Sequence, residues 1–288
     1  MTLDVNRLMN YPFPEIETNL TPRDACLYAL GIGIGEQATD PAQLAFVNEN
    51  GCGEINFRAA PTQPVTMGFF RWVLTPGLGL DVNRVVHGED RITLHGPIPT
   101  EGRVLSKFEI LGVQDKGEGR GALVHCRWVT RQEDSNTAFA TVEMKNFCRG
   151  DGGCGSAGVS SAITSAIPDT PFNREAAVKI RPDAALLYRL SGDLNPLHID
   201  PVYALSAGFE KPILHGRCTM AFAARAIWET TCPPEAVTQI SCRFSAPTYP
   251  GDTLRVLMWD CENTVHFRAL SSDTGKTVID NGQLIFKI

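Results

Sequence analysis

Three side chains that can exchange protons or bind water lie close together in the segment YRLSGDLNPLHID, residues 188–200. They are Asp193, Asn195 and His198. Taken singly, an Asp-x-Asn-Pro sequence is typical of a turn, and a lone histidine is usually structural. Together they are more informative, because Gly192 permits a sharp turn and the proline after Asn195 holds an extended kink. The segment is therefore predicted to direct all three side chains toward one point.

A carboxylate and an imidazole within hydrogen-bonding reach of one water form an acid–base pair. Such a pair removes a proton from the water and delivers another to a substrate, without a metal or a covalent intermediate. A Ser-His-Asp hydrolase would carry its serine in a G-x-S-x-G turn, which this chain lacks. A metal site would use more histidines or carboxylates at ligand spacing. We therefore expect neither a metal nor a cofactor.

A second informative segment is KPILHGRCTMAFAARAIWETT, which begins at residue 211. It places Gly216 directly before a predicted helix. The backbone N–H there lies at the positive end of the helix dipole, a position that suits a developing oxyanion. Glycine is also common at helix starts for structural reasons alone. The adjacent His215 is interpreted as structural.

Together, YRLSGDLNPLH and AGFEKPILHGRCTM resemble the signature of hydratase 2, the (R)-specific enoyl-CoA hydratases of the MaoC-like group. The resemblance extends over the whole chain through four further stretches: HGE at 87–89, PIPTEG at 97–102, DKGEG at 115–119 and CRFSAPTYPGDTL at 242–254. It implies a reversible syn addition of water to a trans-2-enoyl-CoA, which gives a (3R)-3-hydroxyacyl-CoA.

The resemblance also implies roles for individual residues. Asp193 and His198 would activate the water, Asn195 would help to position it, and the Gly216 N–H would polarise the thioester carbonyl. Which of Asp193 and His198 is the base stays open. The residues implied to contact the acyl-CoA substrate are His87, Gly88, Lys116 and Phe244.

The implied fold is a double hot dog, an α+β architecture with two antiparallel sheets, each wrapped around a long helix. Residues 1–148 would form a non-catalytic hot-dog domain that accommodates the acyl chain, and no D-x-N-P-x-H sequence occurs there. Residues 149–162, rich in glycine and serine, are predicted to be a flexible linker. Residues 163–288 would form the catalytic domain.

Hydrophobic periodicity and turn signals predict individual elements in both halves. Helices are expected at 21–33, 181–190 and 215–231. Strands are expected at 66–74 (TMGFFRWVL), 107–115, 122–131, 138–148, 237–244, 253–260, 264–272 and 277–288.

Composition restricts the remaining possibilities. A net charge of −6 with scattered basic residues argues against nucleic-acid binding, and no apolar run is long enough to cross a membrane. Nine cysteines without a C-x-x-C pair predict reduced thiols. The final residues, LIFKI, differ from the S-K-L type of peroxisomal signal, so we expect a cytoplasmic protein, and a homodimer is possible.

Three alternatives remain open at this stage. A hot-dog thioesterase would bind the same ligand and hydrolyse it, and a non-catalytic protein would only bind acyl-CoA. A third possibility is dehydration of a substrate that acyl carrier protein presents. Such a partner would prefer a basic rim, to which Lys116, Lys211 and Arg217 are candidates.

Overall fold

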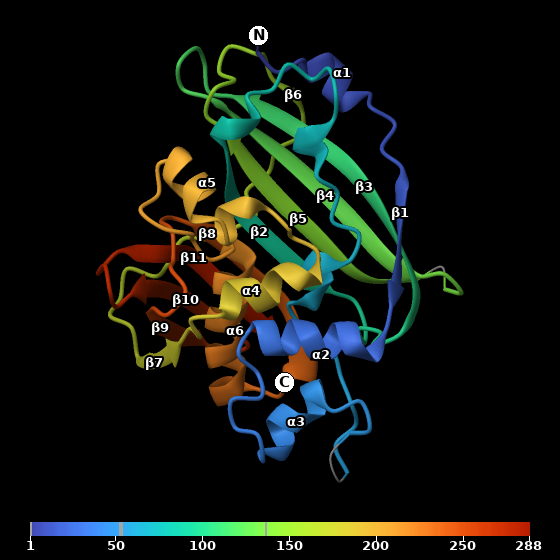
Figure 1. Cartoon of the computed structure of the whole chain (residues 1–288), viewed down its shortest axis with the longest axis vertical. Helices are drawn as coiled ribbons and strands as arrows, with labels where there is room; N and C mark the ends of the chain where they lie inside the picture. The colour runs from blue at the N-terminus through green and yellow to red at the C-terminus, as the bar shows by residue number, and fades with distance from the viewer. Residues whose placement is uncertain (1, 52–53, 136) are drawn as a thin grey trace.

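The computed structural model describes residues 2–51, 54–135 and 137–288. Its strands form one antiparallel sheet that runs through both halves of the chain (Figure 1). The strand order is β1-β3-β4-β5-β2-β8-β11-β10-β9-β7, and β6 pairs with β3. The α+β class is confirmed, and the two expected sheets are joined edge to edge.

The strands of the N-terminal half are β1 (Glu15–Leu20), β2 (Val85–Leu94), β3 (Gly102–Asp115), β4 (Ala122–Gln132), β5 (Ala138–Cys148) and β6 (Ala157–Gly158). Those of the C-terminal half are β7 (Arg174–Lys179), β8 (Val237–Phe244), β9 (Thr253–Cys261), β10 (Thr264–Ser271) and β11 (Thr277–Phe286). The α-helices are α1 (Val5–Met9), α2 (Pro22–Gly31), α3 (Pro41–Val47), α4 (Ala184–Tyr188), α5 (Pro201–Ser206) and α6 (Gly216–Thr231). Short 3₁₀ turns are η1 (Gln63–Thr66), η2 (Trp72–Leu74), η3 (Val82–Arg84), η4 (Arg189–Ser191), η5 (Pro196–His198) and η6 (Pro234–Ala236).

The two halves meet where β2 pairs with β8. In this register Asp90 faces Cys242 and Ile92 faces Ile240. All four side chains are buried. The junction is therefore part of the core, so residues of β2 and β8 hold fixed positions relative to one another.

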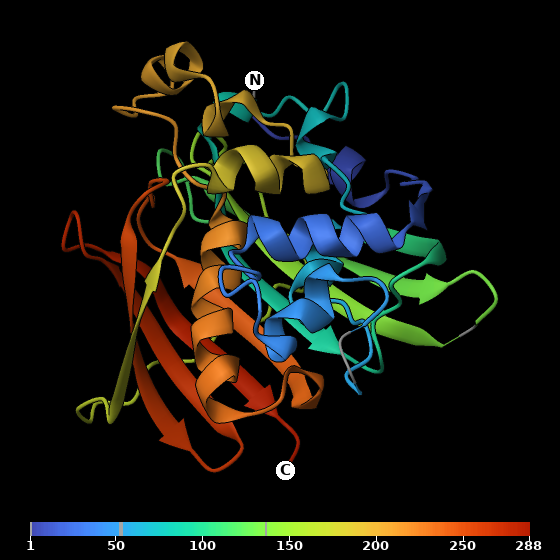
Figure 2. The same cartoon turned by 60° about the horizontal axis from the view of Figure 1, so that its bottom comes forward.

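In the C-terminal half the sheet curves around α6, as Figure 2 shows. Every residue from Arg217 to Trp228 is buried, which is the pattern of a helix enclosed on all sides. Alanines at 221, 223, 224 and 226 keep the helix narrow, so that the strands approach closely. The long helix predicted at 215–231 is confirmed.

In the described residues of the N-terminal half, no helix corresponds to α6. Its longest helix, α2, lies beside α4 (Figures 1 and 2). The strand predicted at 66–74 is wrong, because this segment contains the 3₁₀ turn η2 and a left-handed glycine, Gly68, with φ +73°. It covers the sheet instead, and the Trp72 Nε1–H donates a hydrogen bond to Asn146 Oδ1 at 2.9 Å. The N-terminal sheet is therefore packed against loops and short turns.

The predicted linker is attached to the sheet along part of its length. The Asp115 carboxylate accepts hydrogen bonds from the N–H groups of Gly117, Gly153 and Gly155, and these bonds hold the pKa of Asp115 below its usual value. Farther along, Gly158 pairs with Gly112 of β3. The expectation of a flexible linker therefore does not describe this part of the segment. The domain boundaries themselves stay predictions.

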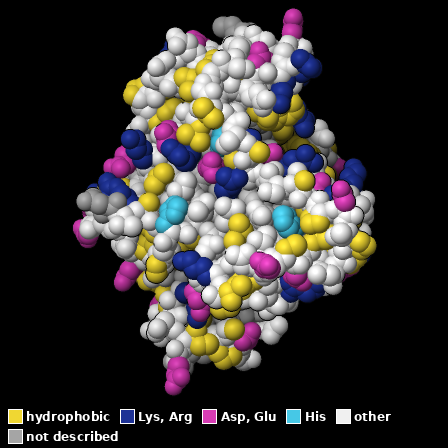
Figure 3. Space-filling view, turned by 180° about the vertical axis from the view of Figure 1, so that it is seen from behind, with side chains coloured by type: hydrophobic (Ala, Val, Ile, Leu, Met, Phe, Trp, Pro, Cys, Tyr) yellow, Lys and Arg dark blue, Asp and Glu magenta, His cyan; other side chains and the backbone are white. Residues whose placement is uncertain are grey.

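The surface carries charges of both signs. On the face drawn in Figure 3, lysine and arginine side chains lie among aspartates and glutamates, with no extended area of one sign. Within the described ranges, none of the helices combines the length and apolar character that a bilayer-crossing segment needs. The cysteines in these ranges form no disulfide.

Candidate active site

The segment after α4 forms the turn that its sequence predicts. The turn η4 is followed by Gly192, whose φ of 120° an L-residue rarely adopts. The Asp193 carboxylate then accepts a hydrogen bond from the Asn195 N–H at 3.3 Å, and Asn195 Oδ1 accepts one from the Leu197 N–H at 3.1 Å. The Asn195 side chain thus caps η5. Its predicted role in positioning water stays a prediction.

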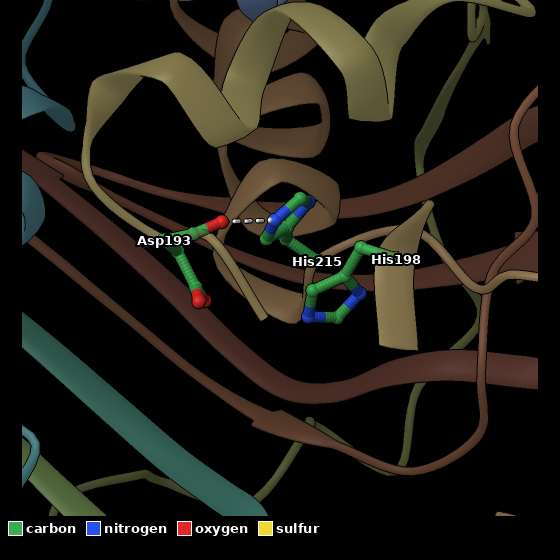
Figure 4. A group of neighbouring side chains, drawn as sticks. All are labelled: Asp193, His198 and His215. Atoms are coloured by element: carbon green, nitrogen blue, oxygen red, sulfur yellow. Dashed lines mark hydrogen bonds between the residues drawn. The ribbon is translucent and has the colours of Figure 1, made fainter. Parts of the chain in front are cut away.

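Backbone hydrogen bonds fix the orientations of two histidine rings. His198 Nδ1 lies 2.9 Å from the carbonyl oxygen of Ile213, so Nδ1–H donates and Nε2 keeps its lone pair. His215 Nε2 lies 3.1 Å from the carbonyl oxygen of Asp193, a bond drawn in Figure 4. His215 Nδ1 is buried without a hydrogen-bond partner among the described residues. Each ring therefore presents one unprotonated nitrogen.

Asp193, His198 and His215 form one compact group. One ligand atom from each residue lies within 4.8 Å of the other two. In Figure 4 the Asp193 carboxylate and the His198 ring extend to the same side of the bond that joins Asp193 to His215. The proximity of Asp193 to His198 was predicted correctly from the sequence, whereas the proximity of His215 to both was not predicted.

The electrostatics of this group favour one charge state. Burial raises the pKa of Asp193, but nearby His215 and His198, the Asn195 N–H and Arg217 outweigh it, and the net pKa is lowered. Burial lowers the pKa of His198, and the Asp193 charge offsets part of this effect. Burial and the neighbouring His198 lower the pKa of His215 to about 3. At neutral pH the group is therefore one carboxylate beside two neutral imidazoles.

Gly216 connects this group to the N-terminal half. It is the first residue of α6, so its N–H lies at the positive end of the helix. A Cβ atom on Gly216 would lie 3.3 Å from the ring of Phe244, and that ring lies 4.7 Å from the His87 ring between centroids. Gly216, Phe244 and His87 therefore follow one another across the β2–β8 junction.

A pocket of about 430 Å³ opens at this junction. It is lined by three predicted substrate-contacting residues, His87, Gly88 and Phe244. Gly88 lies at an irregularity in the pairing of β2 with β5, where a Cβ would come 3.1 Å from the carbonyl oxygen of Lys145. The fourth predicted residue, Lys116, lies in the turn between β3 and β4 and does not line this pocket. Its contact with substrate stays a prediction.

Sequence reasoning missed the basic residues of the pocket, which are Lys145, Arg149 and Arg243. Lys145 is only 6% exposed, but its segment VEMKNF mixes apolar with charged and polar residues, so the sequence pattern gave no signal of this burial. The prediction that Arg217 belongs to a basic rim at the surface is wrong. This residue is only 8% exposed and forms an ion pair with Asp90.

Comparisons with known proteins place the chain in a family. Residues 19–150 match the MFE-2 hydratase 2 N-terminal domain, and residues 164–282 match the MaoC like domain. The chain is 35% identical to "Enoyl-CoA hydratase 2, peroxisomal" of Arabidopsis thaliana, over 94% of this chain and 92% of the relative. It is 36% identical to "3-hydroxyacyl-thioester dehydratase Y" of Mycobacterium tuberculosis, over 84% and 82%. The crystal structure of a MaoC-like dehydratase from Phytophthora capsici superposes with a TM-score of 0.87 at 28% identity, covering 99% of this chain and 98% of that one.

Proposed function

Because the chain belongs to the enoyl-CoA hydratase 2 family, with a MaoC-like domain in its C-terminal half, we propose that it is an (R)-specific enoyl-CoA hydratase. The reaction adds water to a trans-2-enoyl-CoA and gives the (3R)-3-hydroxyacyl-CoA. The observation that supports this best is the ionised Asp193 beside the neutral His198, adjacent to the N-terminal end of α6.

In this proposal Gly216 N–H donates a hydrogen bond to the thioester oxygen. This draws electron density from Cβ and stabilises the enolate that forms when water attacks. The Asp193 carboxylate and His198 Nε2 both start without a proton to give. The proton that reaches Cα therefore comes from the attacking water, through whichever of the two groups removes it. Syn addition also requires the attacking water and the delivered proton to reach the same face of the alkene, and the proximity of Asp193 to His198 supports this.

The pocket at the β2–β8 junction is the proposed binding site of the CoA moiety. CoA carries phosphate groups, and the pocket is lined by the basic residues Lys145, Arg149 and Arg243 against one carboxylate, Glu89, which lies 3.6 Å from Lys145 Nζ. Phe244 lies both in the pocket and against Gly216, so a thioester reaching from one to the other passes this ring. The N-terminal half would accommodate the acyl chain.

Turnover of crotonyl-CoA tests the proposal. Loss of the enoyl absorbance, no release of free CoA thiol, and a 3R product are the expected results. Release of thiol would identify a thioesterase instead, and a 3S product or unaltered substrate would contradict the hydratase assignment.

Variants of the acid–base pair sharpen this test. Asp193→Asn and His198→Gln keep side-chain size and should each lower kcat by at least about 100-fold, since general acid–base catalysis contributes roughly 10²–10⁴. Circular dichroism should match that of the wild type. Substantial turnover by either folded variant would remove that residue from the mechanism.

Further expectations belong to the same proposal. We infer that the reaction uses no cofactor beyond the CoA of its substrate, and that the chain works as a homodimer in the cytoplasm. Cell fractionation checks the location, which is of interest because the Arabidopsis relative is named as peroxisomal. Light scattering on the purified protein checks the oligomeric state.

A further inference from the structure

A buried ion pair joins the two halves at Arg217, the residue that follows Gly216. Arg217 of α6 lies 2.8 Å from Asp90 of β2, between Nε and Oδ2. Its Nη2 lies 3.3 Å from the other carboxylate oxygen, so that two guanidinium nitrogens contact the carboxylate. Asp90 is fully buried. The contact is thus a two-nitrogen pair of fixed geometry.

The rest of the guanidinium surface is also covered by the N-terminal half. It lies over the rings of Phe69 and Trp128, at 4.5 and 5.0 Å from their centroids. Its nitrogens contact Met144 Sδ at 3.2 Å and the carbonyl oxygen of Val65 at 3.4 Å. A side chain from the C-terminal half is therefore embedded in the core of the N-terminal half.

Asp90 holds the active site by two routes. Through Arg217 it holds the residue that follows Gly216. It also accepts a hydrogen bond from His87 Nε2 at 2.8 Å, and the His87 ring packs on Phe244, which contacts Gly216. Both routes end at the first turn of α6. One carboxylate of β2 thus ties a pocket residue and that helix turn together.

We propose that Arg217, anchored by Asp90, is a positioning residue for the hydratase reaction and fixes the Gly216 N–H relative to the substrate pocket of the N-terminal half. The inference rests on the proposed function. Replacing a buried ion pair with apolar residues is often neutral or stabilising. A contribution to folding stability therefore does not by itself explain why this pair is present. Its directional contacts instead set the orientation of the helix start, and a displacement of about 1 Å there can cost roughly 100-fold in rate.

The charge of Arg217 acts on the acid–base group as well. The titratable groups whose charges act on the Asp193 carboxylate are His215, His198, Arg217 and Tyr188. Arg217 is one of the charges that lower the pKa of Asp193. Without this cation the pKa of Asp193 rises, and the acid limb of the kcat–pH profile moves to higher pH.

The test is the double variant Arg217→Met with Asp90→Asn, which removes both charges and leaves neither ion unpaired. We expect kcat for crotonyl-CoA to fall about 10- to 100-fold, with KM changed much less, and the acid limb to move upward. The matched control is Arg225→Met on the same helix, since Arg225 is also buried and pairs with Glu36 and Glu229. This control should lower thermal stability and leave kcat and the pH profile unchanged.

Arg217→Lys keeps a positive charge without the two-nitrogen contact. In this variant the acid limb of the pH profile should lie at its wild-type position, while kcat should stay below the wild-type value. A wild-type kcat and pH profile in the folded double variant would overturn the inference, and so would a wild-type kcat in Arg217→Lys should the double variant not fold. If the wild-type protein itself lacks hydratase activity, crystal structures of wild type and Arg217→Lys still decide the point. A shift of Gly216 relative to His87 supports the inference, and unchanged positions contradict it.

Discussion

The imidazole rings of His198 and His215 stack with their centroids 3.7 Å apart and 29° between their planes. Each ring contacts a backbone carbonyl through one nitrogen. Protonation of either ring would place a positive charge against its neighbour in a buried site. The stack is therefore built for two neutral rings, and acid should disrupt it.

This arrangement predicts a pH-dependent stability. The pKa of His215 in the folded chain is about 3, below its ordinary value of 6.5, so the unfolded chain binds more protons between these values. The free energy of unfolding should then fall as pH decreases from 6.5 toward 3, at up to about 1.4 kcal/mol per pH unit for this residue. His215→Phe keeps a stacked ring that cannot titrate, and its unfolding free energy should depend less on pH in this window.

Urea unfolding at several pH values measures the effect. The control is His95→Gln, which removes an exposed histidine and should leave the wild-type pH dependence intact. An equal pH dependence in His215→Phe and wild type would exclude the stacked pair as its source.

The proposed mechanism also predicts activity without a divalent metal. The atoms of Asp193, His198 and His215 lie within 4.8 Å of one another, a spacing that a cation could also bridge. General acid–base catalysis by these groups needs none. Dialysis against a chelator should leave kcat unchanged, with elemental analysis of the same sample as the check. Loss of activity that zinc or another divalent ion restores would contradict the proposed chemistry.

A comparison of Arg149 with Lys116 tests how CoA is bound. Arg149 lines the pocket, whereas Lys116 lies in the β3–β4 turn outside its lining. Arg149→Gln should raise KM for crotonyl-CoA severalfold and leave KM for the crotonyl thioester of pantetheine, which lacks the phosphates, unchanged. Lys116→Gln should affect neither if the pocket is the CoA site. A selective rise in KM for crotonyl-CoA in Lys116→Gln alone would favour the original prediction from sequence.

Local signals made much of the site predictable. The turn that carries Asp193 and His198 depends on Gly192, Asn195 and a proline, whose backbone preferences act within a few residues. The start of α6 at Gly216 could be predicted for the same reason. Features that depend on residues far apart in the chain could not. Arg217 was placed on a surface rim because its partner Asp90, 127 residues away, approaches only when β2 and β8 pair.

The strand wrongly predicted at 66–74 shows the same limit. Its aromatic and β-branched residues favour a strand by composition. Gly68 is left-handed, however, and a Cβ there would come within 2.0 Å of the Ser106 side chain of β3, so the segment packs across the sheet instead of joining it. The long helix expected in the N-terminal half is absent from the described residues for a related reason. Loops and the ring of Trp72 already fill that face.

The Gly216 N–H can be removed with little change to the helix. Proline is favoured at the first position of a helix, because its missing N–H would have no partner there. The preceding residue, His215, has φ −57° and ψ 134°, which is the extended conformation that a following proline requires. Gly216→Pro should therefore fold and lower kcat by about 100- to 1,000-fold, the cost of losing one donor to an oxyanion.

Gly216→Ala is the matched control. It adds the same Cβ against the Phe244 ring, at 3.3 Å, but keeps the N–H. It should change kcat only a few-fold, since the ring need move only slightly. Circular dichroism and thermal unfolding of both variants separate loss of the donor from loss of the fold. If both folded variants lost equal activity, the cause would be the crowding of Phe244, and the helix-end N–H would have no part in polarising the thioester.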